Sequence, residues 1–257
     1  AYGGLDHVQL HGVGGVQLVL LRSLADFKKG NFTPEYAKSI GDKLHENGIR
    51  VPILGCYINP SDANEESLNE SLDYFIENLH YAKYIGAEMV GLETCRFSDD
   101  DEINNSEETY QYLLKNMKKL VSAAEEIGVN VGIEGVHFHV INTPTKMKRL
   151  VDDLNSPNVR VIFDPVNYIN TANYKNQDEI INTHFDLLGE KTKLLHLKDF
   201  KLVDGEVAYE FPCDGLLNKD LLWDKLKQYN PDIAVILEEV KEDHLAQVKA
   251  AVEKRFV

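Results

Sequence analysis

Four short, mostly apolar runs in the second half of the chain each carry a side chain that can bind a metal ion or transfer a proton. These residues are Glu134, Asp164, His196 and Glu238. Because side chains alternate along a strand, the apolar neighbours would face the helices and all four polar groups would face the opposite side. Three crowded carboxylates repel one another unless a divalent cation lies between them. The pattern therefore indicates a metal site.

For each residue alone, a simpler role is available. An acidic residue at a strand end often caps a helix or solvates a loop. Four residues of the same parity on successive strands are harder to explain by capping, so we interpret them as ligands of one divalent ion. A shell of carboxylates and imidazole suits several ions. We expect Mn²⁺ first, with Mg²⁺, Co²⁺, Zn²⁺ or Fe²⁺ as alternatives.

Seven apolar runs, separated by helical patterns, would position these residues. Consecutive runs start 30 to 41 residues apart, which is typical of β-loop-α units and predicts a parallel sheet. At 257 residues, the chain has the length of an α/β (β/α)8 TIM barrel, which has one strand more than the runs provide. The runs are Val16–Leu21, Val51–Ile58, Met89–Glu93, Asn130–Glu134, Arg160–Asp164, Leu194–Lys198 and Ala234–Glu238.

The beginning of the chain fits this pattern least well. Asp6–Leu10 could form a strand, but only His11–Gly15 separates it from Val16, and that gap is too short for a crossover helix. We therefore predict a first βα unit that is either truncated or irregular.

Helix ends between the runs are marked by capping residues. Thr33 followed by Pro34 predicts a helix start, and Asn47-Gly48 predicts its end. Gly86 and Gly128 predict two further helix ends ahead of the next strands. No linker rich in Pro, Gly or Ser interrupts the series, so we predict a single domain over residues 1–257.

Charge and composition limit the partners. The chain has 42 acidic and 27 basic residues, a net charge of −15, which opposes binding to nucleic acid. No apolar run approaches the roughly 18 residues of a membrane span, and no signal peptide is visible. The three cysteines form no CxxC pair. We expect a reduced, cytoplasmic protein that binds neither nucleic acid nor membrane.

Four segments resemble the xylose isomerase-like TIM barrels, a superfamily that includes sugar phosphate isomerases and epimerases. These segments are Ile133–Gly135, Phe163–Asn167, Leu195–Asp199 and Leu237–Glu239. The resemblance covers about residue 16 to the end and implies that Glu134, Asp164, His196 and Glu238 bind one divalent metal ion. It also implies that Glu134 and Glu238 are the acid/base pair, as in the ketose epimerases, and that the protein is a homodimer or homotetramer.

The resemblance implies proton transfer next to a sugar carbonyl. A metal that chelates a carbonyl and the adjacent hydroxyl acidifies the C–H between them and stabilises an enediolate. Return of a proton to the same carbon by the other carboxylate, on the opposite face of the sugar, epimerises it, and transfer to the next carbon isomerises it. The alternative is dehydration of a polyol or keto-cyclitol on the same site, of the inosose or dehydroshikimate type.

Two other classes share this fold. An endonuclease IV-like enzyme needs a three-zinc cluster with additional histidines, which the predicted strand ends do not provide. A sugar-binding or regulatory barrel has no evident need of two metal-binding glutamates. We therefore expect a metal-dependent isomerase or epimerase acting on a small sugar, sugar phosphate or polyol.

Six further residues near predicted strand ends are candidates for substrate contacts. They are Glu93, Arg96, His137, His139, Asn167 and Lys198. The alternative for Glu93 and Arg96 is a loop-anchoring salt bridge, and for the two histidines it is packing within their loop. The alternative for Lys198 is an internal ion pair with a neighbouring acid.

Some family positions differ in this chain. Asn167 stands where many relatives have histidine, Val140 where the epimerases have glutamate, and Lys198-Asp199 where they have an arginine. We interpret Cys56 and Cys95, which have no visible base partner, as packing residues.

Overall fold

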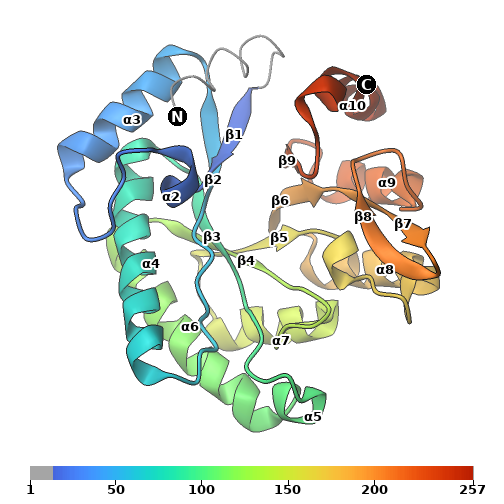
Figure 1. The fold of residues 1–257 in the computed structure, drawn as a ribbon, viewed down its shortest axis with the longest axis horizontal. Coiled ribbons are helices and arrows are strands. Elements are labelled where there is room, and N and C mark those ends of the chain that lie inside the picture. The colour runs from blue at the N-terminus through green and yellow to red at the C-terminus, as the bar shows by residue number, and fades with distance from the viewer. Residues whose placement is uncertain (1–13, 257) are drawn as a thin grey trace. The chain divides into compact units, whose positions relative to one another are not determined.

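The computed structural model describes residues 14–256 and contains seven parallel strands in one sheet (Figure 1). The strand order is β1-β2-β3-β4-β5-β6-β9. The strands are β1 (Gly15–Leu18), β2 (Arg50–Gly55), β3 (Met89–Glu93), β4 (Asn130–Glu134), β5 (Val159–Phe163), β6 (Thr192–Leu197) and β9 (Ala234–Leu237). Each of the seven predicted runs therefore overlaps a strand, and the α/β prediction is confirmed.

Helices connect these strands in sequence. They are α2 (Leu20–Ser23), α3 (Pro34–Glu46), α4 (Glu65–Ile85), α5 (Asp101–Asn104), α6 (Glu107–Ile127), α7 (Pro144–Leu154), α8 (Gln177–Leu188), α9 (Lys219–Tyr229) and α10 (Glu242–Phe256), with 3₁₀ helices η1 (Val166–Tyr168) and η2 (Tyr174–Asn176). The run Val16–Leu21 was predicted too long, because β1 ends at Leu18 and the chain turns into α2. The proposed strand Asp6–Leu10 lies outside the described residues.

The predicted helix caps are present. The Thr33 side chain accepts a hydrogen bond from the backbone N–H of Tyr36, with Pro34 in the first turn of α3. Gly86 and Gly128 end α4 and α6 in the left-handed conformation, each with φ of 82°. Glycine adopts this conformation without the steric penalty of a side chain, which explains why these helices end there.

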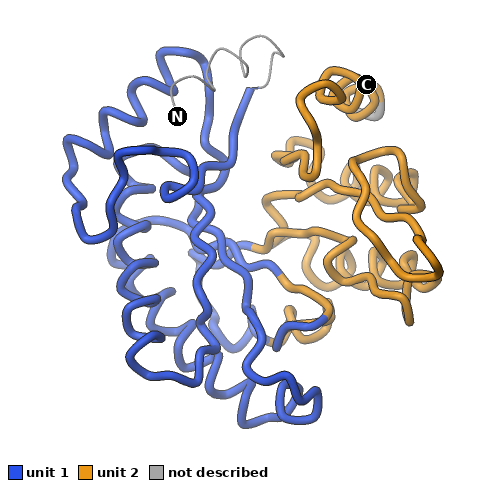
Figure 2. The backbone as a smooth tube through the Cα atoms, viewed as in Figure 1, with its two compact units in different colours: residues 1–134, 138–140, 150–160 blue, residues 135–137, 141–149, 161–257 orange. Residues whose placement is uncertain are grey.

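The described residues form two compact units, shown in different colours in Figure 2. Unit 1 comprises residues 1–134, 138–140 and 150–160, and unit 2 comprises residues 135–137, 141–149 and 161–257. Unit 1 contains β1 to β4 with α3, α4 and α6, and unit 2 contains β6, β9 and helices α8 to α10. The prediction of a single domain stays a prediction.

The core of unit 2 confirms the predicted alternation along the strands. Phe163, Leu195 and Leu197 are fully buried in one hydrophobic cluster with α8 and α9. The Phe163 ring stacks on the imidazole of His184 from α8, with centroids 3.6 Å apart. This packing leaves the intervening residue His196 on the other face of β6.

One antiparallel element was not predicted. Strands β7 (Asp199–Val203) and β8 (Glu206–Glu210) form a hairpin directly after β6. Its turn is Asp204-Gly205, and both residues have positive φ. An Asp-Gly pair at this position is typical of a two-residue hairpin turn. That signal was available in the sequence and could have identified the hairpin.

No helix among residues 14–256 combines the length and apolar character that crossing a bilayer requires.

We predict that His184 makes the stability of the protein sensitive to acid. Burial lowers its pKa from 6.5 to about 3, so the folded protein does not take up the proton that the unfolded chain takes up. The contribution of His184 to the free energy of unfolding should be fully present above pH 6.5. Below that pH the free energy of unfolding should fall by up to about 1.4 kcal/mol per pH unit. Denaturant unfolding between about pH 7 and pH 4 should show a smaller slope for His184→Gln than for the wild type. The exposed-site variant His45→Gln is the control, and an equal slope in all three proteins would contradict the assignment.

Candidate active site

Asp164, His196, Lys198 and Glu238 form a polar cluster at the carboxyl ends of β5, β6 and β9 in unit 2. Lys198 Nζ lies 2.7 Å from Asp164 Oδ2 and 3.1 Å from Glu238 Oε2. His196 Nδ1 lies 3.3 Å from Glu238 Oε1. The structure therefore brings together three of the four predicted metal ligands, with a lysine ammonium between two of them.

The register of β6 against β9 explains this proximity. His196 pairs with Ile236, and the backbone N–H of Glu238 donates to the carbonyl of Leu197 at 2.9 Å. Two strands with this parallel register place Lys198 and Glu238, which are 40 residues apart in the sequence, at the same end of the sheet.

Asp164 is fixed as a charged acceptor. Its side chain is fully buried, and Oδ1 accepts hydrogen bonds from the backbone N–H groups of Val166 at 2.8 Å and Asn167 at 3.2 Å. These bonds tie the carboxylate to the start of η1, leaving Oδ2 for Lys198. A buried carboxylate is stable only with such donors and a nearby cation.

The donor set fits a divalent metal ion. Two carboxylates and an imidazole are a common ligand set for such ions, and the Lys198 ammonium already lies at both carboxylates as a cation. Among the described residues, however, no three His, Cys, Asp or Glu side chains are spaced as a preformed metal site.

In unit 1, two further acidic residues end neighbouring strands. Glu93 of β3 and Glu134 of β4 are register partners, and Glu134 is 2% exposed. His139 is also buried, and its Nε2 lies 3.8 Å from Glu93 Oε2. Glu93 and His139 are thus in contact next to the end of β4, and the inward direction of Glu134 stays a prediction.

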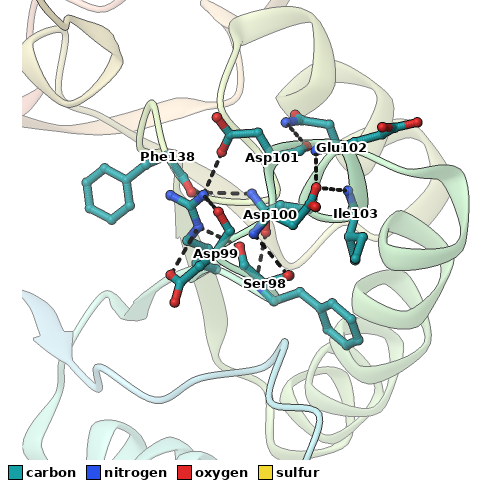
Figure 3. Close-up of polar contacts among 11 residues, drawn as sticks. Ser98, Asp99, Asp100, Asp101, Glu102, Ile103 and Phe138 are labelled. Carbon is teal, nitrogen blue, oxygen red and sulfur yellow. Dashed lines mark hydrogen bonds and ion pairs between the residues drawn. The ribbon is translucent and has the colours of Figure 1, made fainter.

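Arg96 is held by its own loop, whose residues Ser98, Asp99 and Asp101 are labelled in Figure 3. Its guanidinium donates to the carbonyls of Ser98 at 2.5 Å and Asp99 at 2.7 Å and forms an ion pair of 2.5 Å with Asp101. Arg96 therefore makes the loop-anchoring salt bridge that was the alternative to a substrate contact, and its partner is Asp101. The side chain of Asn104 extends the network by accepting from the N–H of Phe97 and donating to the carbonyl of Phe138.

His137 and Asn167 lie together in unit 2. The N–H of His137 donates to the carbonyl of Asn167 at 2.7 Å, and burial lowers the pKa of the His137 imidazole. The imidazole is therefore neutral at pH 7 and can accept or donate a hydrogen bond.

Cys56 and Cys95, which were predicted to be packing residues, carry thiols shielded from solvent to different extents, Cys56 being buried and Cys95 partly buried. All three are free thiols, and burial raises the pKa of Cys56 and raises that of Cys95 to about 12. Neither Cys56 nor Cys95 is a thiolate at neutral pH, so neither is an activated nucleophile.

Asp199 organises the segment that follows the cluster, and its role was not predicted. It is fully buried and accepts from the N–H groups of Phe200, Gly215 and Leu217 at 2.8 to 2.9 Å. Lys219 Nζ lies 2.9 Å from its Oδ2. Its carboxylate thus fixes the start of the hairpin to the loop before α9.

The chain matches the model of one protein family over nearly its whole length. The model of the xylose isomerase-like TIM barrel matches residues 5–255. The chain belongs to this family. The family's barrel architecture confirms the predicted TIM-barrel fold class.

Solved structures of this family cover nearly the whole chain. A D-tagatose 3-epimerase-like protein has a TM-score of 0.78 and 15% identity, covering 99% of this chain and 92% of its own. The IOLI protein, whose structure holds a zinc atom, has a TM-score of 0.76 and 18% identity over the same shares. The probable 3-DHS dehydratase AsbF from Bacillus anthracis has a TM-score of 0.74 and 12% identity, covering 98% and 93%. At these identities the likeness shows the fold alone. No curated protein sequence matches the chain significantly.

We predict that Asp199→Asn lowers the free energy of unfolding by about 2–4 kcal/mol, because the amide loses the ion pair with Lys219 and presents N–H donors to backbone N–H groups. Denaturant unfolding would measure the loss. Asp204→Asn at the hairpin turn is the matched control, because asparagine tolerates the positive φ of that residue. Equal stability of Asp199→Asn and wild type would show that Asp199 does not hold this segment together.

Proposed function

We propose that the protein is a divalent-metal-dependent sugar isomerase or epimerase. The observation that carries this proposal is the cluster in unit 2. There the carboxylates of Asp164 and Glu238 both contact the Lys198 ammonium, and His196 lies beside Glu238. Membership of the xylose isomerase-like family supports it, as does the structural likeness to a D-tagatose 3-epimerase-like protein.

Asp164, His196, Glu238 and Glu134 are the proposed metal ligands. The first three come from unit 2, and Glu134 is added from the family resemblance and from its buried position at the end of β4. Mn²⁺ is our first expectation. The zinc atom in the IOLI structure supports a divalent ion as the cofactor without selecting which one.

The reaction requires a proton to leave and return next to a carbonyl. A bound divalent ion would polarise that carbonyl and acidify the adjacent C–H. Glu134 and Glu238 are the proposed acid/base pair, one carboxylate removing the proton and the other returning it. The imidazole of His196, 3.3 Å from Glu238 Oε1, orients that carboxylate.

The proposed substrate contacts are polar side chains near strand ends. Lys198, Asn167 and His137 in unit 2 and Glu93 and His139 in unit 1 provide hydrogen-bonding groups suited to sugar hydroxyls. Arg96, the remaining candidate, would act by holding the 98–101 loop rather than by direct contact.

Dehydration of a polyol or keto-cyclitol is the second candidate. The likeness to AsbF, described as a probable 3-DHS dehydratase, favours it. The base would remove the same type of proton, and loss of a β-hydroxyl would replace reprotonation. Analysis of the product by NMR separates the two reactions.

The proposal includes a small-molecule sugar or polyol as the partner, within a cytoplasmic homodimer or homotetramer. The net charge of −15 supports the absence of a nucleic-acid partner.

We predict that purified protein binds about one divalent ion per chain after stripping and reloading with Mn²⁺. Asp164→Asn and Glu134→Gln should each weaken binding at least about tenfold, because each loses a charged ligand. Elemental analysis and calorimetry measure this, with the exposed acid variant Asp186→Asn as the control. No binding under any loading condition would refute the metal-dependent function, and about three zinc ions per chain would favour the endonuclease-like class.

Glu238→Gln should lower turnover by about 10²- to 10⁴-fold, because the amide cannot exchange the proton. Exchange of sugar C–H protons in heavy water, followed by NMR at saturating Mn²⁺, measures it. Glu239→Gln changes the next, exposed residue in the same way and serves as the control. Retained formation of product in Glu238→Gln, followed by NMR, would exclude Glu238 as acid or base, whereas proton exchange without product would be consistent with Glu134 acting alone.

A further inference from the structure

Lys198 is the buried cation nearest the proposed metal ligands. It is 5% exposed, and its ammonium contacts both Asp164 Oδ2 and Glu238 Oε2. The Asp164 side chain is fully buried, and its other oxygen accepts hydrogen bonds from the backbone N–H groups of Val166 and Asn167, so the Lys198 ammonium supplies a positive charge next to this carboxylate. In the absence of metal, the lysine thus provides the positive charge that these carboxylates require.

A metal ion and this ammonium cannot hold the two carboxylates in the same way. Carboxylate oxygens bind divalent ions at about 2.0–2.2 Å, closer than the 2.7 Å and 3.1 Å contacts of Lys198. An ion on both oxygens would occupy the volume of the ammonium and repel its charge.

The structure offers the ammonium a second partner. Lys198 Nζ lies 4.8 Å from the centroid of the Tyr209 ring, within the range of a cation–π contact. Tyr209 belongs to β8, whose partner strand β7 starts at the anchored residue Asp199. The ammonium therefore already lies beside this ring, and keeping that contact after it leaves the carboxylates needs no rearrangement of the hairpin.

We propose that Lys198 occupies the position of the metal ion in the metal-free protein and that metal binding moves its ammonium from Asp164 and Glu238 to the Tyr209 ring and the substrate. This inference rests on the proposed function, because it needs the metal site. It assigns Lys198 two roles: it stabilises the empty site, and after release it is a hydrogen-bond donor to a substrate oxygen. Only the metal-loaded enzyme then has Lys198 free to bind substrate.

Lys198→Met keeps the length of the side chain and removes its charge. We expect the metal-free variant to melt at a lower temperature than the wild type, because two carboxylates lose their counter-charge. Mn²⁺ should bind it roughly tenfold or more tightly by calorimetry, because no ion pair has to be broken. Mn²⁺ should also raise its melting temperature more than that of the wild type. Lys201→Met, which removes the surface ion pair of Lys201 with Glu210, is the matched control and should leave Mn²⁺ affinity unchanged.

Removal of any nearby positive charge would also tighten metal binding, so a second measurement follows the ammonium itself. Wild-type protein is labelled with an amine-acetylating reagent with and without saturating Mg²⁺, and each lysine is quantified by mass spectrometry. Release from two carboxylates should increase the labelling rate of Lys198 several-fold and leave that of Lys201 unchanged.

The outcomes separate this inference from the proposed function. Metal binding to the wild type, with no change in Lys198 labelling and no tightening in Lys198→Met, would refute the displacement and leave the metal-dependent function intact. Absence of metal binding in both wild type and Lys198→Met would refute both. Binding only after removal of Lys198 would show that the ammonium blocks the site and is not displaced by metal, which would refute the displacement and the metal-dependent function of the wild type.

Discussion

A buried carboxylate needs a cation and hydrogen-bond donors, and this requirement organises unit 2. Asp164 and Asp199 are both fully buried, and each is matched by one lysine and by backbone N–H groups. Desolvation of an unpaired carboxylate would cost several kcal/mol, comparable to the stability of a domain. The loops after β5 and β6 are therefore shaped around these two side chains.

The two carboxylates differ in what surrounds them. Asp199 contacts Lys219 and three backbone N–H groups. Its surroundings are tightly packed, because a Cβ on Gly215 would lie 2.3 Å from Asp199 Oδ1. Asp164 shares its lysine with Glu238, whose side chain is a quarter exposed. The first pair is suited to hold structure, and the second is suited to exchange its cation.

The fold and the chemistry rest on different observations. Family membership explains the seven parallel strands and their helices, but proteins described as a D-tagatose 3-epimerase-like protein and as a probable 3-DHS dehydratase share this fold. The proposed chemistry rests instead on the side chains at the strand ends, namely the cluster around Lys198 in unit 2 and Glu93, Glu134 and His139 in unit 1.

The sequence by itself determined the strands, the helix caps and the parity of the candidate residues, because these follow from local periodicity and from turn chemistry within a few residues. Asp164 and His196 were identified in this way. Only the tertiary structure decided that Lys198 pairs with Asp164 and Glu238, that Arg96 pairs with Asp101, and that Asp199 fixes the hairpin. The contacts of Lys198 and Asp199 join residues up to 40 positions apart, and they depend on strand register and on the need to neutralise buried charge, which no local pattern records.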